Sequence, residues 1–191
     1  VVRSAAVNRG QQVVRRLRVD FAGLPVGAEL FCERLVFAAR AIGFEVESFA
    51  AHVRWMSEPG TPPPPLTHRV LRVIIVGVPW LADVGFGSAV PTPPLRMDSI
   101  DPQPTQHETF RVVPVGPQHL LQALVEDQWK PVYSIGAEPW LDGQYEMANW
   151  YTSTHPNSHF RHRLIATRTT PEARHVLADG RLTIRRSDGT T

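Results

Sequence analysis

The sequence predicts an α+β fold in which a helical segment precedes a series of short antiparallel strands. Three observations support this prediction. Residues 29–44 repeat apolar residues at helical spacing, residues 45–53 change to an alternating pattern, and residues 67–83 contain two β-type runs separated by Gly77. Many short strands separated by glycine and proline turns are typical of a β-barrel or a β-sandwich, and the pattern alone leaves both open.

The predicted helix covers residues 29–44, and Gly43 supplies its stop signal. Its apolar residues recur three or four positions apart, which places them on one face. These residues are Leu30, Phe31, Leu35, Ala38, Ala39 and Ile42. We therefore expect an amphipathic helix that packs its apolar face on the following strands.

The first predicted strand begins at Glu45, and the proline run at 62–65 predicts a loop after it. Residues 67–76 and 78–83 predict a hairpin, across which His68 and Asp83 are expected to face each other. The proline-dense stretch 91–104 predicts another loop. Further strands are predicted at 110–115, 130–134, 160–169, 175–177 and 181–186, with a helical turn at 145–150 and a hairpin turn at 178–180.

Composition and charge exclude several classes of protein. The chain has 191 residues, 42% of them hydrophobic and 20% charged, which fits an ordinary globular protein. Its net charge of +2 is scattered, so no nucleic-acid partner is expected. The longest apolar run, 73–78, is too short to span a membrane, and the N-terminus has the character of an internal fragment start without a secretory signal. A single cysteine excludes an internal disulfide and predicts a cytoplasmic protein.

Cys32, His68 and Asp83 could supply the three parts of a nucleophilic acyl transfer. Such a reaction needs a thiolate, a base that takes its proton, and a third group that orients the base. Each residue also has a simpler interpretation, because a lone cysteine is commonly a buried filler, a histidine on an apolar strand is commonly structural, and an aspartate before glycines commonly makes a turn. His155, His159 and His162 have metal-like spacing, but Pro156 opposes a regular helix there, so no metal is expected.

Several separate segments resemble the arylamine N-acetyltransferase family. Residues 81–87 and 90–95 resemble the family's catalytic-aspartate segment, Thr67-His68 its catalytic histidine, and residues 145–160 and 181–186 later segments, so that the resemblance covers residues 36–187. The resemblance implies a papain-like arrangement. Its parts would be a truncated helical domain with the candidate nucleophile at 1–50, an antiparallel β-barrel with the histidine and aspartate at 51–152, and a partial α/β lid at 153–191.

The family also implies a reaction. Acetyl-CoA would acylate Cys32, and an arylamine or arylhydrazine would then take the acetyl group in a second, ping-pong step, with His68 as base and Asp83 as its orienting group. The implied contacts to coenzyme A are Gly85, Gly87, Thr152, Ser153 and Ser158, and the implied contacts to the acceptor are Phe86 and Phe160.

The family's nucleophile motif, Arg-Gly-Gly-x-Cys-Phe-Glu-x-Asn, is missing from this chain. An ungapped alignment puts Ala28 where the cysteine belongs and leaves Cys32 four residues late, which is about 6 Å along a helix. Three explanations stay open: a compensating shift of the helix, a catalytically inactive relative, or a damaged reading frame upstream of about Val36. A further enzymatic alternative is an amide synthase of macrolactam biosynthesis, which shares the fold and the triad.

Overall fold

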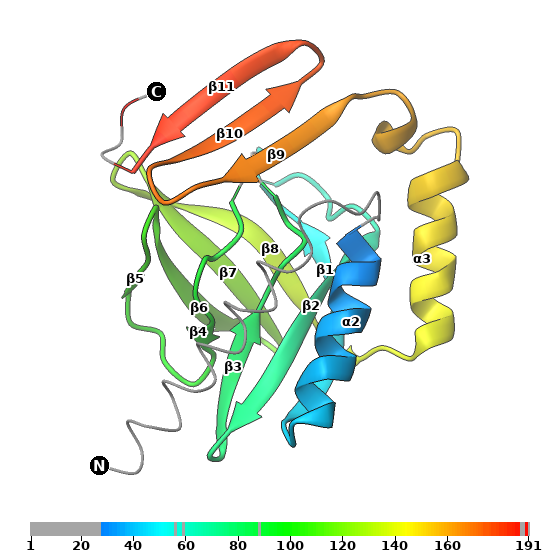
Figure 1. Cartoon of the computed structure of the whole chain (residues 1–191), viewed down its shortest axis with the longest axis vertical. Coiled ribbons are helices and arrows are strands. Elements are labelled where there is room, and N and C mark those ends of the chain that lie inside the picture. Colours follow the sequence, from blue (N-terminus) through cyan, green and yellow to red (C-terminus); the bar gives the residue numbers. More distant parts are fainter. Residues whose placement is uncertain (1–27, 56, 59, 88, 188–189, 191) are drawn as a thin grey trace.

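The computed structural model describes residues 28–55, 57–58, 60–87, 89–187 and 190 (Figure 1). The expectations for residues 1–27, including the fragment start and most of the predicted helical domain, lie outside these residues. The helical elements are α2 (Ala28–Ala41), α3 (Asp142–Thr154) and the 3-10 turn η1 (His159–Arg161). The strands are β1 (Glu45–Val53), β2 (Leu66–Ile75), β3 (Val78–Ala82), β4 (Leu95–Arg96), β5 (Gln103–Pro104), β6 (Thr109–Val115), β7 (Gln118–Val125), β8 (Gln128–Pro139), β9 (Ile165–Thr169), β10 (Ala173–Ala178) and β11 (Arg181–Arg186).

The strands form two antiparallel sheets, which confirms the predicted α+β class. The larger sheet has the order β4-β3-β2-β1-β8-β7-β6-β5 and curls into a nearly closed barrel, so the barrel alternative is the correct one (Figure 1). The smaller sheet has the order β11-β10-β9 and lies across one end of the barrel, while α2 and α3 lie along one side of it (Figure 1).

The helix α2 forms where the apolar spacing predicts it, and it packs on the outer face of β1, β2 and β3. Leu35, Val36 and Ala39 of α2 are buried in one cluster with apolar residues of these strands. Gly43, at φ +91°, turns the chain directly after the helix. Ile42 was expected on the apolar face, but the helix ends at Ala41 and Ile42 is exposed.

The side chains of β2 alternate between the apolar cluster beneath α2 and a second apolar cluster inside the barrel. Leu71 and Val73 face α2, whereas Val70 belongs to the cluster inside the barrel. By the same alternation, His68 lies on the inner face of the barrel with Val70. The direction of the His68 side chain therefore follows from a two-residue repeat that the local sequence already contains.

The β2–β3 hairpin forms as predicted, with Val76 and Gly77 both at positive φ in its turn. Its register differs from the expected one. Leu71 pairs with Ala82, so His68 and Asp83 are not directly opposed. They meet because β3 ends at Ala82 and the chain then bends, which carries the Asp83 side chain toward the start of β2.

Several other elements differ from the sequence predictions. The strand β7 was not predicted, and α3 is longer than the predicted helical turn at 145–150. The predicted loop 91–104 contains the two-residue strands β4 and β5, and only the last part of the predicted strand 160–169 is a strand. The predicted division at residues 50 and 152 falls inside β1 and α3, and it stays a prediction. Among the described residues, no helix is long and apolar enough to cross a membrane.

Candidate active site

His68 and Asp83 form a buried hydrogen-bonded pair at one end of the β2–β3 hairpin. The distance between His68 Nε2 and Asp83 Oδ2 is 2.8 Å. The side chain of Asp83 is fully buried and that of His68 is 11% exposed. Because a carboxylate accepts, Nε2 carries the proton and Nδ1 is the nitrogen that can accept one.

The surroundings of Asp83 keep its carboxyl group ionised. Its second oxygen, Oδ1, accepts hydrogen bonds from the backbone N–H groups of Gly85 at 2.9 Å and Phe86 at 3.1 Å. Burial raises the pKa of Asp83, but the charge and hydrogen bond of His68 and the Gly85 N–H outweigh burial, so that this pKa lies below its ordinary value. Asp83 is therefore an acceptor that can hold the imidazole in one tautomer.

Two aromatic rings enclose the imidazole. The ring centroid of His68 lies 5.2 Å from that of Phe86 and 5.1 Å from that of Tyr133, and the last two are 5.4 Å apart. Burial, the charge of Asp83 and hydrogen bonding to Asp83 raise the pKa of Tyr133 well above its ordinary value, and Cys32 adds a smaller effect in the same direction. Tyr133 was not predicted as part of the site, because nothing in the local sequence distinguishes it from a core aromatic.

Cys32 lies on α2, beside the start of β2. Its thiol is in a side chain that is 2% exposed, and it donates a hydrogen bond to the backbone carbonyl of Arg69, with a distance of 3.7 Å from Sγ to the oxygen. Arg69 directly follows His68 in the chain. However, α2 packs on the outer face of β2, whereas the His68 ring lies on the inner face. The Cys32 sulfur nevertheless lies close enough to Tyr133, whose ring contacts that of His68, to contribute to the raised pKa of this tyrosine.

Arg69 joins four elements around the candidate nucleophile. Its Nε and Nη2 donate to Ser48 Oγ on β1, and its guanidinium lies 4.2 Å from the centre of the Tyr145 ring on α3. It also forms longer ion pairs with Glu33 on α2 and Asp142 on α3. Sequence reasoning missed Arg69, since its partners lie far away along the chain.

The predicted contacts to coenzyme A and the acceptor fall into two groups. Gly85, Phe86 and Gly87 follow Asp83 directly, and Phe86 contacts the His68 ring. The second group lies on α3 and around η1, with the Thr152 and Ser153 hydroxyls donating to the Asn149 carbonyl. The Ser158 hydroxyl donates to the Thr152 carbonyl, and Phe160 is exposed beside His159. Within the described part of the chain, no hydrogen bond or ring contact joins this second group to His68 or Asp83.

The three histidines with metal-like spacing do not gather around a common point. The His155 ring stacks on Tyr151, and His162 Nε2 contacts the Pro156 carbonyl. In the ranges that the structure describes, no group of three or more histidine, cysteine, aspartate or glutamate side chains is arranged to hold a metal ion.

Comparisons with known proteins agree with this architecture. The sequence model of a family described as N-acetyltransferase matches residues 33–191. Arylamine N-acetyltransferase of Mycolicibacterium smegmatis is 38% identical over 158 residues, which are 82% of this chain and 58% of that protein. The Escherichia coli arylamine N-acetyltransferase is 35% identical over 133 residues, or 70% of this chain and 47% of that one.

Solved structures give the same result. A crystal structure of a variant M. smegmatis arylamine N-acetyltransferase superimposes with a TM-score of 0.81 at 36% identity, over 86% of this chain and 61% of that one. The Mycobacterium marinum enzyme in complex with CoA gives a TM-score of 0.79 at 32% identity, over 94% and 72%. The chain therefore spans somewhat more than half the length of several proteins that it matches. It belongs to the arylamine N-acetyltransferase family.

Proposed function

We propose that this chain transfers an acetyl group from acetyl-CoA to an arylamine or arylhydrazine through Cys32, His68 and Asp83. The observation that carries the proposal is the buried pair of His68 and Asp83, with 2.8 Å between its polar atoms. This pair leaves His68 Nδ1 as the proton acceptor. His68 directly precedes Arg69, whose backbone carbonyl the Cys32 thiol contacts. The family membership and the CoA complex of the M. marinum relative support the choice of donor.

The proposed reaction has two steps. His68 takes the proton of the Cys32 thiol, the thiolate attacks the thioester carbonyl of acetyl-CoA, and the C–S bond to coenzyme A breaks. Coenzyme A leaves with the proton from His68. The amine then attacks the carbonyl of the acetylated Cys32, and the C–S bond to Cys32 breaks. His68 carries the proton that the amine loses to the sulfur, so that an amide forms and the thiol is restored. Phe86 would contact an aromatic acceptor beside the His68 ring, and Gly85, Gly87, Thr152, Ser153, Ser158 and Phe160 remain proposed contacts to coenzyme A or the acceptor.

One observation favours a second candidate, an inactive relative that keeps the scaffold. The Cys32 thiol is buried, and it donates a hydrogen bond to the backbone carbonyl of Arg69. A hydrogen bond donated to a carbonyl stabilises the neutral thiol rather than the thiolate. In addition, Cys32 is one turn inside α2, whereas the start of a helix is where the helix dipole favours a thiolate.

Mass spectrometry of the intact chain separates the two candidates. After incubation with acetyl-CoA, one acetyl group on Cys32 supports the enzyme, and the Cys32→Ala variant should stay unmodified. p-Nitrophenyl acetate serves as a second donor, because it reports on the nucleophile without requiring a coenzyme A site. If Cys32 stays unmodified with both donors, the enzymatic proposal fails.

A double variant tests the scaffold independently of Cys32. Ala28→Cys combined with Cys32→Ala moves the thiol by one turn, to the first residue of α2. If this variant is acetylated while the wild-type chain is not, the wild-type chain is an inactive relative that keeps a working scaffold. We further propose that the protein works in a reducing compartment, where its single cysteine stays a thiol.

A further inference from the structure

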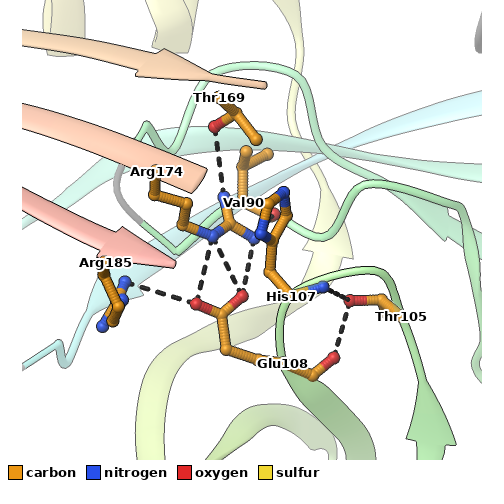
Figure 2. Close-up of polar contacts among 7 residues, drawn as sticks. All are labelled: Val90, Thr105, His107, Glu108, Thr169, Arg174 and Arg185. Atoms are coloured by element: carbon orange, nitrogen blue, oxygen red, sulfur yellow. Dashed lines mark hydrogen bonds and ion pairs between the residues drawn. The ribbon is translucent and has the colours of Figure 1, made fainter. Parts of the chain in front are cut away.

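The smaller sheet holds a buried arginine that reaches across to the barrel. Arg174 of β10 is 1% exposed, and its partner Glu108, next to β6, is 8% exposed. The two lie 66 residues apart in the sequence. The Arg174 Nε lies 3.0 Å from both carboxylate oxygens of Glu108, and Nη2 lies 2.7 Å from Oε2 (Figure 2). A bidentate contact of this kind fixes the relative orientation of the two side chains as well as the distance between them.

The same guanidinium also donates a hydrogen bond to a backbone carbonyl. Nη2 also donates to the carbonyl oxygen of Val90 at 2.7 Å, and Nη1 donates to Thr169 Oγ1 at 3.3 Å (Figure 2). Val90 ends the segment that begins at Asp83, which we call the Asp83 loop (residues 83–87 and 89–90). Arg174 thus ties the barrel, the smaller sheet and the Asp83 loop together through one side chain.

The Asp83 loop is held at its other end by the candidate active site. Its backbone N–H groups at Gly85 and Phe86 donate to Asp83 Oδ1, while Asp83 Oδ2 accepts from His68. The smaller sheet meets the loop once more, since a Cβ built on Gly87 would lie 3.0 Å from Thr167 Oγ1 on β9. A shift of the loop would therefore change the orientation of the carboxylate that faces the imidazole.

We propose that Arg174 is a positioning residue that holds the Asp83 loop, and through it the Asp83 carboxylate, in the orientation that faces His68. Its role in catalysis rests on the proposed function, but its effect on the loop does not. A buried ion pair is weak support for stability, because desolvation offsets much of its attraction, whereas it specifies geometry where other hydrogen bonds complete it. The contact with Val90 completes it in this way.

Four variants separate loop positioning from general attachment of the sheet. Arg174→Met removes the guanidinium, and Arg174→Lys keeps the charge but loses the planar fork that spans Glu108 and Val90. Arg185→Met removes the second arginine on Glu108, whose Nη2 lies 3.3 Å from Oε1, without touching the Val90 contact. Arg163→Met, from the exposed ion pair with Asp179, is the matched surface control.

The measurement is amide hydrogen exchange followed by NMR. In Arg174→Lys, we expect the Gly85 and Phe86 amides to exchange at least about tenfold faster, while the amides of β10 and β11 stay protected. Arg185→Met and Arg163→Met should stay within about twofold of wild type at Gly85 and Phe86. Unchanged exchange in Arg174→Lys overturns the proposal, and so does an equal increase in Arg185→Met. If Arg174→Met does not fold, Arg174→Lys still decides.

Acetylation of Cys32 provides the second readout. The rate should fall at least about tenfold in Arg174→Lys, in parallel with the loss of Gly85 and Phe86 protection, and stay unchanged in Arg163→Met. Faster exchange with an unchanged acetylation rate overturns the link to His68. If the wild-type chain is not acetylated at all, the proposed function fails, and the exchange data alone still decide whether Arg174 holds the loop.

Discussion

His68 Nε2 and Asp83 Oδ2 lie 2.8 Å apart, with the carboxylate fully buried and its other oxygen occupied by two backbone N–H groups. We expect Asp83→Asn to lower the acetylation rate of Cys32 by about 10³- to 10⁴-fold, with the fold retained. The amide oxygen would take over the two N–H groups and turn the NH₂ toward His68. His68 would then carry its proton on Nδ1 and could not accept one there. Single-turnover acetylation measures the effect.

Asp98→Asn is the matched control for this substitution. Asp98 forms an ion pair with Arg96 that is exposed, so its loss should leave acetylation unchanged and have little effect on stability. An Asp83→Asn variant that keeps a tenth or more of the wild-type rate would show that the pair does not orient a catalytic base.

Gly87 is required by its backbone conformation and by its neighbour. Its φ is +80°, and an added Cβ would meet Thr167 Oγ1 at 3.0 Å. We expect Gly87→Ala to lower the free energy of unfolding by about 2–3 kcal/mol, of which about 1 kcal/mol comes from the positive φ. Urea denaturation measures the loss.

Gly180→Ala isolates the conformational part. Gly180 has a similar φ of +84°, but nothing lies within 4 Å of an added Cβ, so only the cost of about 1 kcal/mol should remain. Adding Thr167→Ser to Gly87→Ala would leave the hydroxyl but allow it to rotate away, and should recover part of the difference. Equal losses in Gly87→Ala and Gly180→Ala would refute the contact with β9.

The Tyr133 hydroxyl is buried beside the Asp83 carboxylate, and although hydrogen bonding between the two groups contributes to the raised pKa of Tyr133, the contact does not have standard hydrogen-bond geometry. An unsatisfied buried hydroxyl costs about 1–3 kcal/mol. We therefore expect Tyr133→Phe to be neutral or stabilising in urea denaturation at pH 7, because the ring contacts with His68 and Phe86 remain.

Tyr133→Leu provides the contrast, since it removes both ring contacts and should cost about 2–4 kcal/mol. A loss of more than 2 kcal/mol in Tyr133→Phe itself would mean that the hydroxyl is bound to the Asp83 carboxylate after all, and that the aspartate has one more donor than the geometry assigns.

The sequence predicted elements whose patterns are local. The α2 helix, the β2–β3 hairpin and β11 follow from apolar periodicity and from glycines in their turns, as at Gly77 and Gly180. The strand β7 was missed because Gln118–Val125 does not alternate, and its place between β6 and β8 comes from pairing on both sides. Pairing also decides the two-residue strands β4 and β5.

The candidate site could be predicted only where the family spacing contains it. The family spacing contains the 15-residue step from His68 to Asp83, and this contact forms even though the expected register of the hairpin was wrong. The position of Cys32 beside the start of β2 depends on how α2 packs on the barrel, which no local pattern encodes. Arg69 and Arg174 were missed for the same reason, because their partners are distant in the chain.

His107 should make stability depend on pH between about 5 and 7. Burial lowers its pKa and the Arg174 guanidinium lowers it further, while Glu108 opposes the shift without cancelling it. Because the folded pKa lies below the unfolded value of about 6.5, the unfolded chain binds more protons as the pH falls, and stability is lost below about pH 6.5. His107→Gln should therefore flatten the fall of the unfolding free energy between pH 7 and 5.

His119, whose pKa is lowered by burial and by Arg72, contributes in the same direction, so His119→Gln should remove a separate, additive part of this fall. Urea denaturation across this range tests both assignments, and an unchanged slope in either variant would show that the pKa of that histidine is the same in the folded and unfolded chains.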